Sequence, residues 1–155
     1  MGVEAAFNVK REECADWVAA VRAVNGGKGA SLVLDPVAQD YAAGNVDVLE
    51  PDGRWVLYGL MSGAELPPIK RVLGAFLAKR LTLQGTTLRA RPKPYKQALA
   101  AEVEKLVPAI ASDEFKVRVD KAFPFTTDGV RAAHVMMSRN ENIGKIILTV
   151  REEDE

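Results

Sequence analysis

Short apolar runs alternate with helical stretches along most of this chain. Runs at 30–34, 55–58 and 81–88 are each long enough for one strand, and between them apolar residues recur every three or four positions. The runs themselves are almost continuously apolar, as parallel strands covered on both faces commonly are. Strands that alternate with helices in this way build a parallel sheet between helical layers. The sequence therefore predicts an α/β fold of the Rossmann-like, mostly parallel type, with helices on both faces.

The expected elements follow from this periodicity and from Gly and Pro signals. Strands are predicted at 5–9, 30–34, 55–58, 81–88, from 115 until Pro124 stops the strand, and at 144–150. Helices are predicted at 14–21, 39–49, 68–80, 95–106 and from 127 onwards. Pro68 is placed in a first helical turn, followed by a stripe made of Ile69, Val72, Leu73, Phe76 and Leu77. Ligands of parallel sheets bind beyond the carboxyl ends of the strands, so the stretches after residues 34, 58 and 87 are the expected ligand sites.

Length, charge and composition exclude several classes of protein. The chain has 155 residues, 48% of them hydrophobic, which suits a single domain over 1–155. Lys plus Arg and Asp plus Glu each number 21, and neither sign dominates a long segment except the acidic end, so nucleic acid is not an expected partner. One Cys and one His cannot form a zinc site of the usual kind. No leader or membrane-spanning run is recognised, so a cytoplasmic protein is expected.

Three strings in the sequence resemble one enzyme family. They are LVLDPV followed by NVDVLEPDGRWVLYGLMSG, then TTLRARPKPYKQAL, and finally NENIGKIILTV. Together they are similar to the C-terminal part of the zinc-independent, zeta-crystallin-type quinone oxidoreductases of the medium-chain dehydrogenase/reductase family. The resemblance implies a Rossmann-like domain and hydride transfer from NADPH to a quinone or an enone.

The same resemblance implies that parts of the family's usual architecture have no counterpart in this sequence. Family members have a β-rich substrate domain and a Gly-rich strand–loop–helix that holds the cofactor pyrophosphate, and the segment NGGKG follows a helix instead of a strand. We therefore expect weak or no NADPH binding and weak or no activity by this chain alone. Strands next to the gap are expected to be exposed, so the chain should rearrange, associate or aggregate unless another chain fills the gap.

Seven residues are the candidate cofactor-binding residues that the resemblance implies. They are Tyr58, Gly59, Leu60, Met61, Thr87, Leu88 and Arg89. The first four match a loop along the cofactor, where Gly59 would let the backbone approach the dinucleotide. The last three match a segment near the nicotinamide. The alternatives are a plain strand-to-helix turn for the first group and the end of an edge strand for the second.

Two departures from the family pattern concern the cofactor. Val9 stands where a tyrosine commonly packs near the nucleotide. The turn after the strand at 30–34 has Pro36 and Ala38 in place of a small, Gly-containing turn, and Pro36 lacks an N–H group. Both changes argue against close approach of a pyrophosphate at this turn.

No other residue is assigned a catalytic or metal-binding role. Arg139 and Lys145 are interpreted as solvated surface residues or as contacts to phosphate or ribose, and His134 as a packing or capping residue. Cys14 is interpreted as part of an apolar helix face. The lack of an assigned catalytic residue is compatible with hydride transfer, because in that reaction the cofactor carries the chemistry.

Two functions remain open at this point. The first is a portion of an NADPH-dependent quinone or enone oxidoreductase. The second is a non-catalytic module that acts through dimerisation or through complementation by a partner chain. Since family dimers pair through the last strand of the nucleotide domain, the segment 81–88 is the expected homodimer contact.

Overall fold

The computed structural model describes residues 3–9, 15–112 and 117–151. Contacts within the chain divide it into a first unit, Gly2–Lys96, and a second unit, Gln97–Glu155. Helix α4 (Lys93–Glu104) crosses the boundary between them. The predicted helix start at Cys14 lies outside the described residues.

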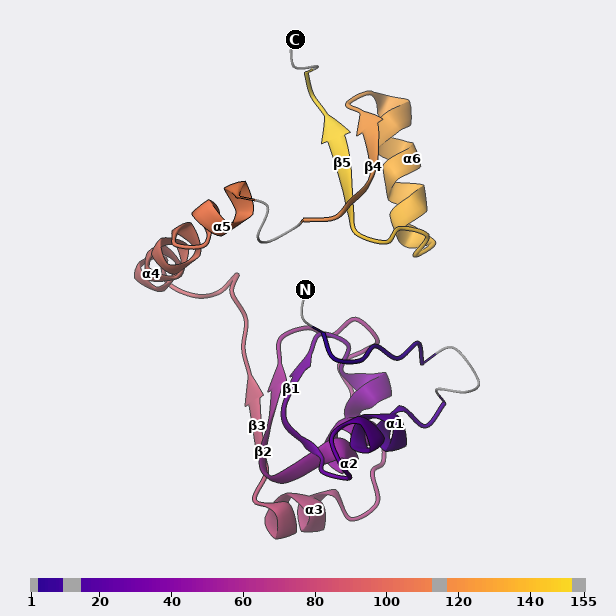
Figure 1. Cartoon of the computed structure of the whole chain (residues 1–155), viewed down its shortest axis with the longest axis vertical. Helices are drawn as coiled ribbons and strands as arrows, with labels where there is room; N and C mark the ends of the chain where they lie inside the picture. Colours follow the sequence, from indigo (N-terminus) through magenta and orange to yellow (C-terminus); the bar gives the residue numbers. More distant parts are fainter. Residues whose placement is uncertain (1–2, 10–14, 113–116, 152–155) are drawn as a thin grey trace. The chain divides into compact units, whose positions relative to one another are not determined.

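A three-stranded parallel sheet forms the centre of the first unit (Figure 1). Its strands are β1 (Ala30–Asp35), β2 (Leu49–Leu57) and β3 (Thr82–Gly85), in the order β1-β2-β3. The register aligns Val33 with Trp55 and Trp55 with Leu83, so these three side chains share one face. The α/β fold with parallel strands is thus confirmed.

Four helical segments accompany this sheet. They are α1 (Trp17–Val24), the 3-10 turn η2 (Gln39–Tyr41), α2 (Ala42–Val48) and α3 (Val72–Lys79). The core consists of Ala42, Val46, Leu49 and Trp55, packed against Val33, Ile69, Val72, Ala75, Phe76 and Leu81. Helices α2 and α3 therefore bury their apolar sides on the sheet face that carries Trp55.

The opposite face of β1 is exposed in the first unit. Leu32 and Leu34 alternate with Val33 and are 48% and 61% exposed, although consecutive apolar residues predicted a strand covered on both faces. The outer edge of β1 also has no strand partner within the described part of the chain. The observed exposure contradicts the two-sided cover that the apolar run predicts, whereas the family resemblance implied exposure of strands beside a gap in the sheet.

Several predicted elements differ from the observed ones. The strand predicted at 81–88 covers only Thr82–Gly85, and the helix predicted at 39–49 is divided into a 3-10 turn and a helix. Residues 5–9 do not form a strand, because no strand lies beside them to accept their backbone hydrogen bonds. Helix α3 begins at Val72 instead of Pro68, after Arg71 adopts a left-handed φ of 57°. This later start places Ile69 and Val72 inward but leaves Leu73 and Leu77 82% and 81% exposed.

The second unit contains a two-stranded parallel sheet covered by one helix (Figure 1). Strands β4 (Val119–Pro124) and β5 (Lys145–Thr149) pair, α6 (Thr127–Ser138) contacts both, and α5 (Val107–Ala111) follows α4. The Thr126 hydroxyl accepts from the N–H of Gly129 and caps α6, and Ala133 is buried. Met137, on the same helix, is 53% exposed.

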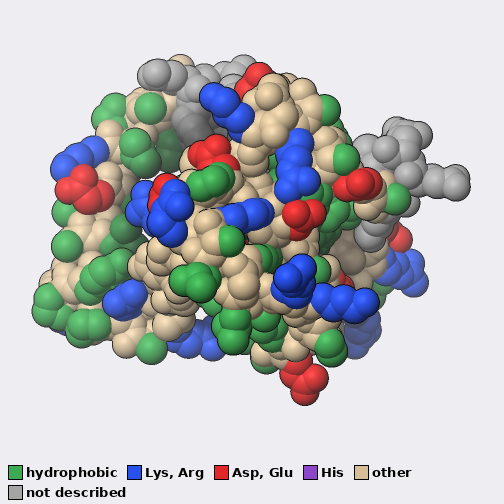
Figure 2. All heavy atoms as spheres, turned by 90° about the horizontal axis from the view of Figure 1, so that it is seen from below, with side chains coloured by type: hydrophobic (Ala, Val, Ile, Leu, Met, Phe, Trp, Pro, Cys, Tyr) green, Lys and Arg blue, Asp and Glu red, His purple; other side chains and the backbone are tan. Residues whose placement is uncertain are grey.

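Apolar side chains are widespread on the molecular surface. The face drawn in Figure 2 has hydrophobic side chains between Lys, Arg, Asp and Glu. None of the described helices is both long and apolar enough to span a membrane.

Candidate functional site

Two loops at the carboxyl ends of β1 and β2 are hydrogen-bonded to each other. The backbone N–H of Tyr58 donates to the carbonyl of Asp35 at 3.0 Å, and that of Met61 donates to Pro36 at 3.1 Å. Ser62 donates to the Val37 carbonyl through both its backbone N–H and its hydroxyl, each at 2.9 Å. The loop after β2 is therefore held in place by the loop after β1.

Asp35 is the centre of the first of these loops. Its carboxylate is 4% exposed, and Oδ1 accepts from the N–H groups of Val37 at 2.7 Å and Ala38 at 3.0 Å. Oδ2 accepts from Nδ2 of Asn45 at 2.8 Å and from Nε1 of Trp55 at 3.0 Å. Four donors compensate for the cost of burying this charge, so the turn after β1 is fixed to the core.

These hydrogen bonds limit what the turn after β1 can bind. A pyrophosphate at a strand end is usually held by free backbone N–H groups. Pro36 has no N–H group, and those of Val37 and Ala38 already donate to Asp35. Ala38 also has a φ of 75°, a conformation that suits glycine. The turn therefore has few donors left for a phosphate. This agrees with the argument from Pro36 and Ala38 against close approach of a pyrophosphate.

Gly59 is required by the contact between the two loops. A Cβ atom at this position would lie 2.5 Å from the carbonyl oxygen of Pro36. Glycine thus permits the close approach of one loop to the other, which is a sufficient reason for its presence. The predicted role, close approach to a dinucleotide, stays a prediction.

A pocket of about 610 Å³ lies at the carboxyl ends of β2 and β3. Its lining consists of Leu57, Tyr58, Gly59, Leu60, Gly85, Thr86, Thr87 and Arg89. Five of the seven predicted cofactor-binding residues are therefore brought together around one space. Leucine and tyrosine side chains supply apolar walls, two threonines supply hydroxyl groups, and Arg89 supplies a positive charge.

The other two candidates do not line this pocket. Met61 is 80% exposed and is tied to the loop after β1 through its N–H group. Leu88 is 54% exposed, and its carbonyl accepts from the N–H of Arg91. Gly85, which lines the pocket, has open space where a Cβ atom would lie.

The turn after β3 is held by basic side chains. The N–H of Thr86 donates to the Leu57 carbonyl at 2.9 Å, which joins the end of β3 to β2. Arg91 donates to the Thr86 hydroxyl at 3.1 Å and lies over the Tyr95 ring. Nζ of Lys96 donates to the Arg89 carbonyl at 2.7 Å. Arg91 and Lys96 therefore have structural contacts through their side chains.

Residues 66–101 carry a charge bias that the sequence analysis missed. This segment contains eight Lys and Arg residues and no Asp or Glu: Lys70, Arg71, Lys79, Arg80, Arg89, Arg91, Lys93 and Lys96. The statement that neither sign dominates an internal segment is therefore wrong. A count of charge within a sliding window detects this bias, which the zero net charge of the whole chain conceals.

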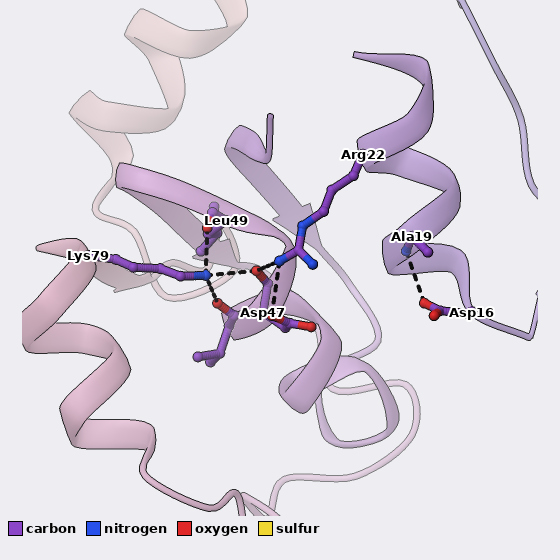
Figure 3. A network of polar contacts seen from close by, with 7 residues as sticks. Asp16, Ala19, Arg22, Asp47, Leu49 and Lys79 are labelled. Carbon is purple, nitrogen blue, oxygen red and sulfur yellow. Dashed lines mark hydrogen bonds and ion pairs between the residues drawn. The ribbon is translucent and has the colours of Figure 1, made fainter. Parts of the chain in front are cut away.

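A separate polar network stabilises the junction between α2 and β2 (Figure 3). Nζ of Lys79 donates to the carbonyls of Val46, Asp47 and Leu49 at 3.2, 2.8 and 2.9 Å. Arg22 donates to the backbone and side chain of Asp47 at 2.7 and 3.0 Å. Cations at the carbonyl end of a helix are favourable, so this network is structural.

The remaining candidates do not form a catalytic or metal-binding cluster. Among the described residues, no group of three or more His, Cys, Asp or Glu could hold a metal ion. His134 is exposed on α6, and Arg139 lies 3.8 Å from the Glu141 carboxylate. Cys14 falls outside the described residues.

Comparisons with known proteins identify similar chains. A family model described as zinc-binding dehydrogenase matches residues 1–148. A 2-haloacrylate reductase from Burkholderia sp is 29% identical over 138 residues, which cover 86% of this chain and 39% of the reductase. These matches confirm the predicted resemblance at the level of the family.

Solved structures are similar to the chain over most of its length. Escherichia coli quinone oxidoreductase complexed with NADPH has a TM-score of 0.73 and 26% identity, covering 93% of this chain and 42% of the enzyme. An NAD-dependent alcohol dehydrogenase has a TM-score of 0.74 at 20% identity, covering 97% of this chain and 39% of that one, and so supports the fold alone. The chain thus spans about two fifths of the length of these relatives.

Proposed function

The chain belongs to the zinc-binding dehydrogenase family, and from this premise we propose that it is a portion of an NADPH-dependent oxidoreductase of quinones or enones. The observation that carries the proposal is the pocket at the carboxyl ends of β2 and β3. In parallel α/β sheets, cofactors and substrates bind at this end of the strands. Residues 1–155 would then form one partial nucleotide-binding domain.

In this proposal the pocket receives the nicotinamide end of NADPH, which supplies a hydride when it is bound. The loop Tyr58–Met61 would form one wall, and Thr87–Arg89 the other. The apolar side chains of Leu57 and Leu60 would cover the ring and exclude water, while the threonine hydroxyls offer hydrogen bonds to its amide. The protein's contribution is placement, because the lining contains no acid–base pair.

The pyrophosphate half of the cofactor has much weaker support in this chain. Val37 and Ala38 donate to Asp35, and the printed sequence contains no Gly-rich G-x-G-x-x-G motif. We therefore expect the chain alone to bind NADPH more weakly than about 1 μM, and to need the missing donors from another segment for turnover.

The substrate class follows from the names of the relatives. One is a quinone oxidoreductase and another a 2-haloacrylate reductase, so an activated carbon–carbon double bond conjugated to an acceptor group is the common chemistry. We propose a quinone or an enone for this chain, hydride transfer without zinc, and a cytoplasmic location.

A chimera tests this function directly. Residues 1–148 would replace the matching segment of E. coli quinone oxidoreductase, which then supplies the rest of the enzyme. We expect NADPH oxidation that depends on an added quinone or enone, measured by the loss of absorbance of the reduced nicotinamide. A folded chimera that binds NADPH but oxidises none with any acceptor would refute the proposal. Calorimetry on the isolated chain provides the second measurement, and micromolar affinity there would contradict the expected weak binding.

The second candidate is a non-catalytic module that associates with another copy or with a partner chain. Its supporting observation is the free edge of β3, which pairs with β2 on one side and with no other strand in the described residues. All four β3 residues are exposed, and Leu83 is 48% exposed. Such an edge can pair with a second strand, which supports the homodimer predicted through 81–88.

Sedimentation of the isolated chain over a dilution series distinguishes this candidate. We expect a dimer that dissociates on dilution, and weaker association after Leu83→Pro. The N–H of Thr86 bonds β2, and N–H groups alternate along a strand, so the N–H of Leu83 lies on the free edge, where proline removes a donor and blocks pairing without breaking the bonds to β2. The control is Lys70→Gln, which alters an exposed side chain away from the edge. A proline at Gln39 would not serve as a control, because it would alter a contact between loops. A monomer at all concentrations with an intact circular dichroism spectrum would contradict the module.

A further inference from the structure

Arg89 has no partner for its guanidinium group among the described residues. The ion pairs and hydrogen bonds of the structure engage Arg91, Lys96 and Arg80, whereas Arg89 contributes only its backbone carbonyl to Lys96. A guanidinium has five N–H donors arranged as a fork that matches a carboxylate. Arg89 therefore offers an unused anion-binding group at the pocket.

The pocket around Arg89 is otherwise apolar or neutral. Among its lining residues, Arg89 is the sole side chain that is charged at neutral pH, and no lining residue is acidic. Leu57, Leu60 and Tyr58 provide the apolar part, and Thr86 and Thr87 provide hydroxyl groups. A ligand that matches this lining has a compact apolar body and one negatively charged end.

The charge of the surrounding segment favours the same ligand. Residues 66–101 contain eight cations and no acid, so no acidic side chain from this segment competes for Arg89. Arg91 and Lys96 add positive potential next to the turn while their own donors hold Thr86 and the Arg89 carbonyl. Two cations thus hold the turn, and Arg89 is the cation of this segment that lines the pocket.

We propose that Arg89 binds the carboxylate of an acidic substrate, and that the pocket accepts a small α,β-unsaturated carboxylate, whose double bond is activated in the same way as that of an enone. The inference rests on the proposed function, because the reducible double bond of such an acid would have to lie next to the nicotinamide. Arg89 would hold the acid group, and the carbon skeleton would lie in the pocket beside the nicotinamide. Arg89 then determines specificity within the pocket and takes no part in the hydride transfer itself.

The test compares an acid with its neutral amide on the complete chain. Isotopically labelled protein is titrated with 2-chloroacrylate and with 2-chloroacrylamide at constant ionic strength, and backbone amide resonances are followed by NMR. We expect saturable shifts at 57–60 and 85–89 with the acid, and binding of the amide weaker by about tenfold or more, the loss expected for a charge-assisted hydrogen bond.

Three variants identify the group responsible. Arg89→Gln should weaken binding of the acid about tenfold or more, while Arg89→Lys, which keeps the charge without the fork, should retain part of it. Lys93→Gln makes the same change in net charge in the same basic segment but does not line the pocket, so it should leave the affinity almost unchanged. Because Arg89 is exposed, all three variants should keep the spectrum of the folded chain.

Several outcomes would overturn the inference. They are equal affinity for acid and amide, unchanged affinity in Arg89→Gln, an equal loss in Lys93→Gln, or no saturable shift by about 50 mM acid. The chimera separates this result from the proposed function. If the chimera reduces quinones with NADPH but shows no preference for the acid, the proposed role of Arg89 is wrong and the proposed oxidoreductase function is supported. If the chain binds the acid but the chimera oxidises no NADPH, the anion site at Arg89 is supported and the proposed oxidoreductase function is wrong.

Discussion

The indole N–H of Trp55 donates to Oδ2 of Asp35 across the parallel pair β1 and β2, at 3.0 Å. Both side chains are almost fully buried, with 3% and 4% of their surfaces exposed. The bond joins the middle of β2 to the end of β1, where the turn beside the candidate site begins. The order of that turn thus depends on a residue in the centre of the sheet.

Replacement of Asp35 should therefore destabilise the chain strongly. Asp35→Ala leaves the donors of Asn45 and Trp55 and two backbone N–H groups buried without an acceptor, and we expect a loss of about 3 kcal/mol or more in unfolding free energy. Urea denaturation measures this change. Asp40→Ala removes an exposed carboxylate in the same turn and should cost less than about 0.5 kcal/mol. Equal losses in the two variants would show that the Asp35 network contributes little.

Ala38 is the position where a substitution should stabilise the chain. Its φ of 75° and ψ of −106° are unfavourable for a residue with a Cβ atom. Ala38→Gly should therefore raise the unfolding free energy by about 1 kcal/mol, less the greater entropy that glycine gives the unfolded chain. Ala42→Gly, at the start of α2, provides a control of opposite sign, because it lowers helix propensity and removes a buried methyl group. A destabilised Ala38→Gly variant would contradict the argument.

Gly59 and Gly85 form a matched pair within the same pocket lining. Gly59→Ala places a methyl group 2.5 Å from the Pro36 carbonyl oxygen, so the two loops must separate, at a cost of about 1–3 kcal/mol. Gly85→Ala meets open space and should change stability by less than about 1 kcal/mol. Thermal unfolding of both variants checks this, and amide exchange at Met61 and Ser62 should accelerate in Gly59→Ala alone.

Lys79 should contribute to stability more than the other surface lysines. Lys79→Met removes an ammonium that binds three carbonyls at the end of α2, and we expect a loss of about 1–2 kcal/mol (Figure 3). Lys70→Met, at an exposed position, is the control. Since Arg22 also donates to the Asp47 carbonyl, the double variant Arg22→Met/Lys79→Met should lose more than the sum of the single losses. Strict additivity would show that the two cations act independently.

The pair Asp52 and Arg80 should be visible in a pH titration. Two hydrogen bonds of 2.6 and 2.7 Å from Arg80, aided by its charge, hold the pKa of the Asp52 carboxyl below its ordinary value. A lowered pKa in the folded state gives a stabilising contribution above the ordinary aspartate pKa, which is lost as the pH falls through the folded-state pKa. Both side chains are exposed, so the effect on stability should be small and sensitive to salt.

Carboxyl NMR of the chain and of Arg80→Gln measures this shift. The pKa of Asp52 should rise in Arg80→Gln and should remain low in Lys70→Gln, which removes a charge elsewhere. High salt should reduce the difference between the chain and Arg80→Gln. An unchanged Asp52 pKa in Arg80→Gln would contradict the pairing.

The strands of the first unit were predictable because their apolar runs are continuous and end at clear signals. Asp35 closes β1 as expected, and β2 is longer than predicted because pairing with β1 extends it back to Leu49. The start of α3 was not predictable from Pro68, since the left-handed Arg71 delays the helix by four residues. Residues 5–9 lacked a partner strand, which periodicity alone does not reveal.

The candidate site was likewise predictable from the sequence only in part. The resemblance selected seven residues, and the register of β2 with β3 explains why five of them surround one pocket. It did not reveal that Gly59 is needed for contact with Pro36, because that contact joins loops separated in the sequence. It selected Arg89 but did not reveal that the side chains of Arg91 and Lys96 hold the turn while the Arg89 guanidinium is left without a partner among the described residues, since these contacts depend on the folded turn.

The sequence by itself determined the order of strands and helices, the family and the positive charge of residues 66–101, because these depend on local periodicity, motifs and counts. Tertiary structure decided which backbone donors remain free and which cations are engaged by other groups. Those properties depend on pairs such as Asp35 with Trp55, twenty residues apart, which become neighbours only when β1 and β2 align.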